Sequence, residues 1–152
     1  MFAIATELNS AAKAADKWSV EELEEDSIKK VALYARAQIS PMAAFWGGIV
    51  AQEVVKYTGK YTPLKQWLHF DAFEIVPDPS ADRSPANSRY DDQIAIVGRE
   101  VHNKLKSMNI FLVGAGALGC EFLKALALMG VSSDGECVVT DDDTIEVSNL
   151  SR

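Results

Sequence analysis

Cysteine, histidine and positive charge are scarce in this chain, and each shortage narrows the possible functions. Among 152 residues there are two cysteines and two histidines, and Cys120 and Cys137 form no Cys-x-x-Cys pair. These four residues build no credible metal site, so we predict no metal-binding residue in the chain. The net charge of -7 and the pI near 4.8 argue against nucleic acid or an anionic membrane as partner.

Long hydrophobic runs and a signal peptide are also missing. The longest apolar runs, 41–51 and 110–120, are too short to span a bilayer. The sequence after Met1 lacks a charged n-region and soon turns polar, so we expect no secretory leader. With 48% hydrophobic residues the chain can still form one domain-sized core.

The most informative segment is a glycine-rich loop between an expected strand and helix. Residues 109–113 are typical of a buried strand, and the loop Gly114-Ala-Gly116-Ala-Leu-Gly119 follows. Gly114 allows the tight turn, Gly116 lets the backbone approach a phosphate, and Gly119 lets the helix pack closely on the sheet. A second strand ends at Asp141, where a carboxylate can accept hydrogen bonds from ribose hydroxyls. The pattern predicts a nucleotide-binding βαβ unit of α/β class.

The glycines alone do not distinguish NAD, S-adenosylmethionine and ATP. Transfer of an adenylyl group needs cations and hydrogen-bond donors around the phosphates, because negative charge builds there during the reaction. The polar residues that follow the second strand suit that chemistry: Asp141, Asp143, Asn149 and Arg152. We interpret Asp142 as part of a solvated turn. An NAD-dependent oxidoreductase would leave the Ser-Asn-Leu-Ser-Arg run at 148–152 without a role.

Several runs of sequence resemble the ubiquitin-activating enzymes. The resemblance rests on Phe-Leu-Val-Gly-Ala-Gly-Ala-Leu-Gly-Cys-Glu from 111, Val-Val-Thr-Asp-Asp-Asp-Thr-Ile-Glu from 138, and Ser-Asn-Leu-Ser-Arg from 148. It extends upstream through Asn-Ser-Arg-Tyr-Asp-Asp-Gln from 87, and through Ser-Pro-Met-Ala-Ala-Phe-Trp-Gly-Gly from 40. It covers nearly the whole chain and is weakest over the first 38 residues.

The resemblance implies ATP- and magnesium-dependent adenylation of the C-terminal carboxylate of ubiquitin or a ubiquitin-like modifier. A cysteine of another domain would then take the acyl group as a thioester, before transfer to a ubiquitin-conjugating enzyme that binds elsewhere. It implies nucleotide contacts for Ala117, Asp141 and Asn149, and a catalytic, phosphate-contacting role for Arg152. Asp143 matches a second acid of the motif. The expected location is the cytoplasm and nucleus.

The resemblance also implies a domain organisation. It divides the chain into the end of a helical bundle (1–38), the end of an inactive adenylation domain (39–76), a linker (77–88), and the start of the active, Rossmann-like adenylation domain (89–152). The phosphate-contacting lysine, the metal-binding aspartate and the thioester cysteine of the family have no counterpart here. We therefore expect a piece of a longer protein that is inactive alone. A non-catalytic scaffold is the alternative.

Local patterns predict the remaining elements. Ser19 and Glu22 form a capping-box pattern that predicts a helix or a helix pair from Ser19 to about Ala37. Pro41 and Gly59 bracket a helix that is expected to be buried on most sides, with another backbone packed against Gly47-Gly48. Residues 66–72 are typical of a strand. Residues 91–98 and 99–107 are expected to be helical, with an apolar stripe of Val97, Val101 and Leu105.

Overall fold

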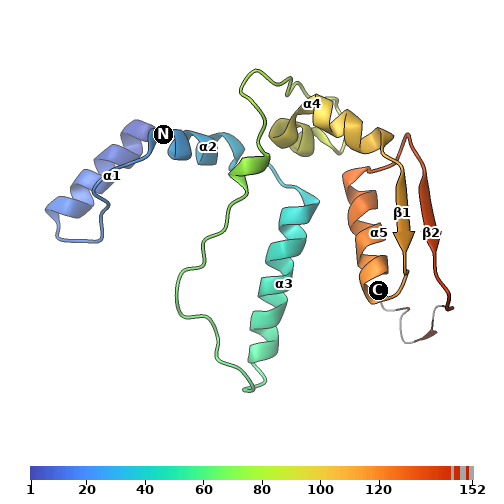
Figure 1. Cartoon of the computed structure of the whole chain (residues 1–152). Coiled ribbons are helices and arrows are strands. Elements are labelled where there is room, and N and C mark those ends of the chain that lie inside the picture. Colours follow the sequence, from blue (N-terminus) through green and yellow to red (C-terminus); the bar gives the residue numbers. More distant parts are fainter. Residues whose placement is uncertain (145, 148–149, 151–152) are drawn as a thin grey trace. The chain divides into compact units, whose positions relative to one another are not determined.

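The chain forms two compact units, Met1–Ala37 and Gln38–Arg152 (Figure 1). The computed structural model describes residues 1–144, 146–147 and 150. Within these residues, helices dominate and one small parallel sheet occurs, in keeping with the predicted α/β class. No helix of the described part is long and apolar enough to cross a membrane.

The first unit is a pair of helices, α1 (Phe2–Ala14) and α2 (Glu25–Tyr34). The predicted helix start at Ser19 is wrong, because the segment before Glu25 is irregular and no side chain caps α2. Asn9 of α1 accepts a hydrogen bond from the Val20 N–H and donates one to the Val20 carbonyl, both at 2.9 Å. These two hydrogen bonds hold residue 20 against α1 within the irregular segment.

The second unit begins with α3 (Ser40–Lys56), which has Pro41 in its first turn as predicted. Gly59, with φ of +80°, lies just beyond its end. The expected burial is wrong, since no residue of α3 is fully buried. Nothing lies within 4 Å of a Cβ built on Gly47 or Gly48, so no other backbone packs against that pair in the described structure.

The predicted strand at residues 66–72 is absent. This segment is irregular up to a short 3-10 turn, η1 (Phe73–Ile75). A strand needs a hydrogen-bonded neighbour, and the sheet found among the described residues pairs only two later segments. Phe70 instead stacks on Phe45 of α3, with ring centroids 4.2 Å apart.

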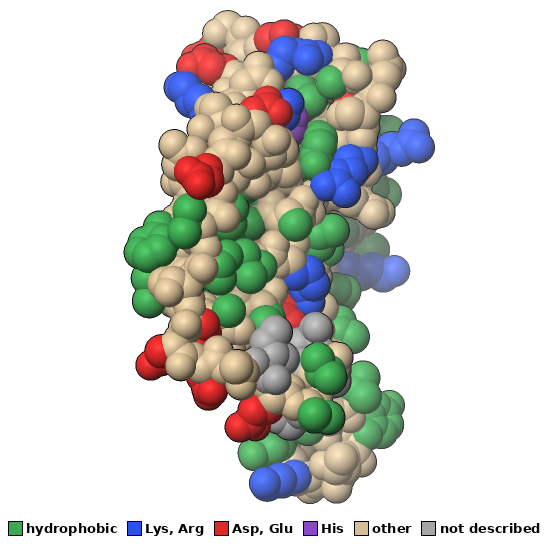
Figure 2. Space-filling model, turned by 90° about the vertical axis from the view of Figure 1, so that its right-hand side faces the viewer, with side chains coloured by type: hydrophobic (Ala, Val, Ile, Leu, Met, Phe, Trp, Pro, Cys, Tyr) green, Lys and Arg blue, Asp and Glu red, His purple; other side chains and the backbone are tan. Residues whose placement is uncertain are grey.

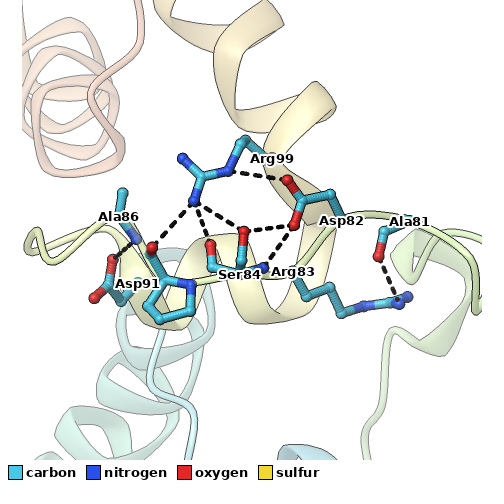
Figure 3. Close-up of polar contacts among 8 residues, drawn as sticks. Ala81, Asp82, Arg83, Ser84, Ala86, Asp91 and Arg99 are labelled. Atoms are coloured by element: carbon cyan, nitrogen blue, oxygen red, sulfur yellow. Dashed lines mark hydrogen bonds and ion pairs between the residues drawn. The ribbon is translucent and has the colours of Figure 1, made fainter.

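Residues 76–90 contain no helix or strand, as their prolines predict, yet side chains hold them firmly. Arg83 donates hydrogen bonds to the carbonyls of Pro77, Asp78, Pro79 and Ala81. Arg99 pairs with Asp82, at 3.2 Å, and donates to the carbonyl of Pro85, at 3.1 Å (Figure 3). These contacts order residues 76–90 and attach the segment to the following helix.

Helix α4 (Asp91–Ser107) consists of two helical pieces joined at Gly98, where φ is 81° and ψ is 158°. The prediction of helices on either side of this glycine is confirmed. The predicted stripe is wrong in part, because Val101 is exposed while Ile94, Ile96 and His102 are buried. The break at Gly98 turns the second piece relative to the first, so one helical periodicity does not hold across it.

The strand β1 (Ile110–Val113), the helix α5 (Ala117–Met129) and the strand β2 (Cys137–Thr140) form a βαβ unit. The strands are parallel, with Ile110 opposite Cys137 and Val113 opposite Thr140. Figure 1 shows α5 lying along both strands, which run in the same direction. Gly130 ends α5 in the left-handed conformation, with φ of 72°. The predicted strand–loop–helix–strand order is confirmed.

The connection from α5 to β2 fastens α4 to this unit. The N–H groups of Ser132 and Asp134 donate to the carbonyls of Leu105 and Lys106, at 3.0 and 2.9 Å. These carbonyls belong to the last turn of α4, where the Leu105 carbonyl also accepts the Met108 N–H at 3.4 Å. Lys106 and Asp134 also form an ion pair at 2.8 Å. Helix α4 and the βαβ unit are thereby joined by backbone as well as by side chains.

One face of the sheet is open. Phe111 and Val113 are 67% and 72% exposed, while Ile110 and Leu112, on the other face of β1, are half-buried. The outer strand β2 is exposed along its whole length. Apolar side chains are visible on the face of the molecule turned to the viewer in Figure 2. Within the described residues, each strand has one neighbour only.

Candidate functional site: the glycine loop and the end of β2

The glycine loop lies where the parallel strands end, between β1 and the start of α5. Gly114 leaves the strand with φ of +93°, a backbone conformation that favours glycine. A Cβ on Gly119 would lie 2.0 Å from the Gly114 carbonyl oxygen, so only glycine allows α5 to approach the loop this closely. The backbone roles predicted for these two glycines therefore have a direct steric basis.

Gly116 differs from the other two glycines of the loop. It precedes the first residue of α5, Ala117, and a Cβ built on it would meet nothing within 4 Å. The space beside it is open, as close approach of a phosphate requires. Among the described residues no side chain caps the start of α5, whose first N–H groups carry partial positive charge. An anion placed here would meet the preferred end of the helix dipole.

Asp141, immediately after β2, reaches back to this loop. Its Oδ2 accepts a hydrogen bond from the Ala115 N–H, and its Oδ1 accepts one from the Asp143 N–H at 3.0 Å. Hydrogen bonds from the backbone N–H groups of Ala115, Asp143 and Asp142 hold the pKa of Asp141 below its ordinary value. The carboxylate is therefore ionised at neutral pH and ties the end of β2 to the glycine loop.

Cys120 supports the same loop from the other side. Its thiol donates to the Ala115 carbonyl at 3.0 Å, and its backbone N–H donates to the Gly116 carbonyl at 2.9 Å. The side chain is half-buried in the first turns of α5. This geometry gives Cys120 a structural role in the loop.

The predicted site residues are brought together as far as the structure describes them. Gly114, Gly116, Ala117, Gly119 and Asp141 lie in or against one loop. Asp143 follows in a turn, where its Oδ1 accepts a hydrogen bond from the Thr144 N–H at 2.7 Å. Asn149 and Arg152 lie outside the described residues, and their predicted roles remain predictions. The sequence argument did not identify Ala115, because its contribution is made by its backbone alone.

A second polar cluster joins α4 to the far end of α5. The Gln93 Nε2 lies 3.1 Å from His102 Nδ1 and also donates to the Met129 carbonyl at 3.1 Å. Both side chains are buried, at 7% and 5% exposure, and the Tyr90 ring lies 5.0 Å from the imidazole. The order of polar and apolar residues along α4 does not reveal such a pair, so it could not be predicted from the sequence. The cluster holds the βαβ unit against α4.

The described residues include no group of three or more histidine, cysteine or acidic side chains arranged to hold a metal ion. The site is thus built from backbone N–H groups and one anchored carboxylate. Such a set of groups can bind an anion beside a hydroxyl-bearing ligand, which is the chemistry of a nucleotide.

Comparison with known proteins finds relatives of this sequence. Residues 90–152 match the ThiF family, a range that begins just before α4 and includes the whole βαβ unit. The chain is 53% identical to a ubiquitin-activating enzyme of Triticum aestivum over 139 residues, which are 88% of this chain and 13% of that protein. It is 48% identical to one of Arabidopsis thaliana over 158 residues, with 100% of this chain and 14% of that protein covered.

An animal relative gives the same result. The chain is 45% identical to a ubiquitin-like modifier-activating enzyme of Rattus norvegicus over 161 residues, which cover 97% of this chain and 15% of that protein. The chain therefore spans a small part of the length of the curated relatives it matches. Over that part, it is related to the ubiquitin-activating enzymes, and residues 90–152 are a ThiF-family, Rossmann-like segment.

Proposed function

We propose that the chain contributes part of the ATP site of an enzyme that adenylates the C-terminal carboxylate of ubiquitin or a ubiquitin-like modifier. The central observation is the arrangement at the end of the parallel strands, where an open glycine loop and the carboxylate of Asp141 lie together. The Arabidopsis thaliana relative, which bears a ubiquitin-activating name, aligns with the whole chain and therefore across this site. A role in interdomain packing alone would not require the open space at Gly116.

In this proposal the phosphates lie against Gly116, Ala117 and the N–H groups at the start of α5, and Asp141 accepts hydrogen bonds from the ribose. ATP supplies the adenylyl group, with pyrophosphate as leaving group. Gly114 and Gly119 shape the loop. Asn149 and Arg152 add a nucleotide contact and a phosphate contact, and Asp143 supports the turn after β2.

We propose that Mg²⁺ accompanies the ATP and that the carboxylate which holds it belongs to a part of the whole protein outside this chain. The acyl group passes to a cysteine of another domain, because the half-buried Cys120 is already engaged with the Ala115 carbonyl. We propose the modifier and a ubiquitin-conjugating enzyme as partners of the whole protein, with neither nucleic acid nor membrane as partner. Its proposed location is the cytoplasm and nucleus.

A segment exchange tests the proposal. Residues 90–152 replace the matching segment of the Triticum aestivum relative, and ATP–pyrophosphate exchange is measured with ubiquitin and Mg²⁺. We expect activity within about 10-fold of the parent, because the segment supplies the same backbone groups to the phosphates. The same chimera carrying Gly116→Val should lose exchange while keeping its thermal midpoint. A folded chimera without exchange would overturn the proposal.

A further inference from the structure

The backbone of Ala115 is held at both its N–H and its carbonyl by side chains of different elements. Its N–H donates to Asp141 at the end of β2, and its carbonyl accepts from the Cys120 thiol of α5. The preceding residue is fixed as well, since the Gly114 N–H donates to the Thr140 carbonyl at 2.8 Å. The Gly114 carbonyl also lies so close to Gly119 that a Cβ on Gly119 would be 2.0 Å from its oxygen. These hydrogen bonds fix the conformation of the glycine loop at Gly114 and Ala115.

We infer that Asp141 is a positioning residue for the phosphate loop as well as the expected ribose acceptor. This inference rests on the proposed function of the site. The geometry makes the two roles compatible, because the two carboxylate oxygens together offer about four acceptor positions and the backbone N–H groups of Ala115, Asp143 and Asp142 use three of them. The remaining position is available to a ribose hydroxyl. One side chain thereby couples the ribose half of the site to the phosphate half.

If Asp141 positions the loop, its removal changes phosphate affinity in the direction opposite to that expected from charge alone. Removing a carboxylate near an anion site lowers repulsion, so a purely electrostatic effect would strengthen phosphate binding. If Asp141 holds the loop in the conformation that binds phosphate, removing it weakens phosphate binding instead. Part of the binding free energy is then consumed in ordering the loop. Asp142 is the matched control: it is an exposed carboxylate one residue away, and no side-chain bond is seen for it in the described part of the chain.

The first measurement needs no nucleotide. Amide hydrogen exchange of Ala115 is followed by NMR in the full 152-residue chain, in Asp141→Ala and in Asp142→Ala. We expect exchange at Ala115 to be about 10-fold faster in Asp141→Ala, the scale for losing one hydrogen bond to a charged acceptor, and unchanged in Asp142→Ala. Cys120→Ala should accelerate amide exchange in the loop less than Asp141→Ala does. Cys120→Ser retains a hydrogen-bond donor and should return the exchange rate to that of the unaltered chain. Equal exchange at Ala115 in Asp141→Ala and the unaltered chain would overturn the inference.

The second measurement separates the two halves of the ligand. Adenosine and inorganic tripolyphosphate are titrated separately against the same three proteins, with the glycine-loop amide signals as readout. We expect Asp141→Ala to weaken both ligands by about 10-fold, and Asp142→Ala to leave tripolyphosphate binding unchanged or slightly tighter. Loss of adenosine binding alone would show that Asp141 serves only the ribose, which overturns the inference. If the unaltered chain binds neither ligand, the proposed nucleotide site fails, and the exchange rates alone decide whether Asp141 holds the loop.

Discussion

A single methyl group at Gly119 should destabilise the protein, whereas the same methyl at Gly116 should not. In Gly119→Ala the new Cβ would lie 2.0 Å from the Gly114 carbonyl oxygen and 2.9 Å from its carbon. Separations below 3.0 Å are not tolerated, so the loop and the helix must part by about 1 Å. Gly114 cannot follow easily, because its N–H is bonded to Thr140 of β2.

The magnitude follows from two opposing effects. Overpacking of this kind costs about 1–3 kcal/mol, and a clash with backbone belongs at the upper end of that range. Alanine is favoured over glycine within a helix by about 1 kcal/mol, which offsets part of the cost. We therefore expect a net loss of about 2 kcal/mol in the free energy of unfolding, or about 4–8 °C in Tm.

Thermal unfolding followed by circular dichroism measures this effect, with Gly116→Ala as the control. Gly116 has φ of -70°, which alanine adopts readily, and its Cβ would meet nothing within 4 Å. Its replacement should change stability by less than about 1 kcal/mol, since alanine is a poorer N-cap than glycine by a small amount. Equal stability of the two variants would show that α5 does not approach the glycine loop as closely as the structure indicates.

Three further predictions concern the loop, the buried histidine and the isolated chain. Gly116→Val should abolish ATP binding without unfolding the protein, because the branched side chain occupies the open space beside the loop; calorimetry that finds unchanged affinity would refute this. Burial, then the charges of Lys106 and Arg99, lower the pKa of His102 from 6.5, against an opposing effect of Asp134. The unfolded chain therefore takes up a proton more readily, and Tm should fall as the pH drops below about 6.5, a slope that His102→Phe should reduce. The isolated chain should show no pyrophosphate exchange and should self-associate through the open sheet, which light scattering over a concentration series would detect.

The sequence predicted the elements that are specified locally and missed those set by tertiary contacts. The βαβ unit followed from glycine spacing and hydrophobic periodicity, which depend on neighbours along the chain. The helix start at Ser19 failed because Asn9, from another helix, binds Val20. The strand at 66–72 failed because strands form only with a partner, and none is present among the described residues.

The site likewise has parts that local sequence predicts and parts that only tertiary contacts define. Residue types and spacing indicated the glycines and Asp141, because their backbone freedom or charge suits phosphate and ribose. The hydrogen bonds of Asp141 and Cys120 to the two sides of Ala115 could not be predicted, because any residue except proline offers the same N–H and carbonyl. The buried pair of Gln93 and His102 also depends on the position of the Met129 carbonyl, which only the packed structure defines.

The central claim is that the glycine loop and Asp141 form a nucleotide site, and an NMR titration of the chain with ATP tests it most directly. This measurement detects weak binding and reports which amides respond. We predict saturable shifts at Gly116, Ala117, Gly119 and Asp141, and smaller shifts with NAD at the same concentration. Absence of shifts at these residues with millimolar ATP, or shifts confined to other parts of the chain, would contradict the account.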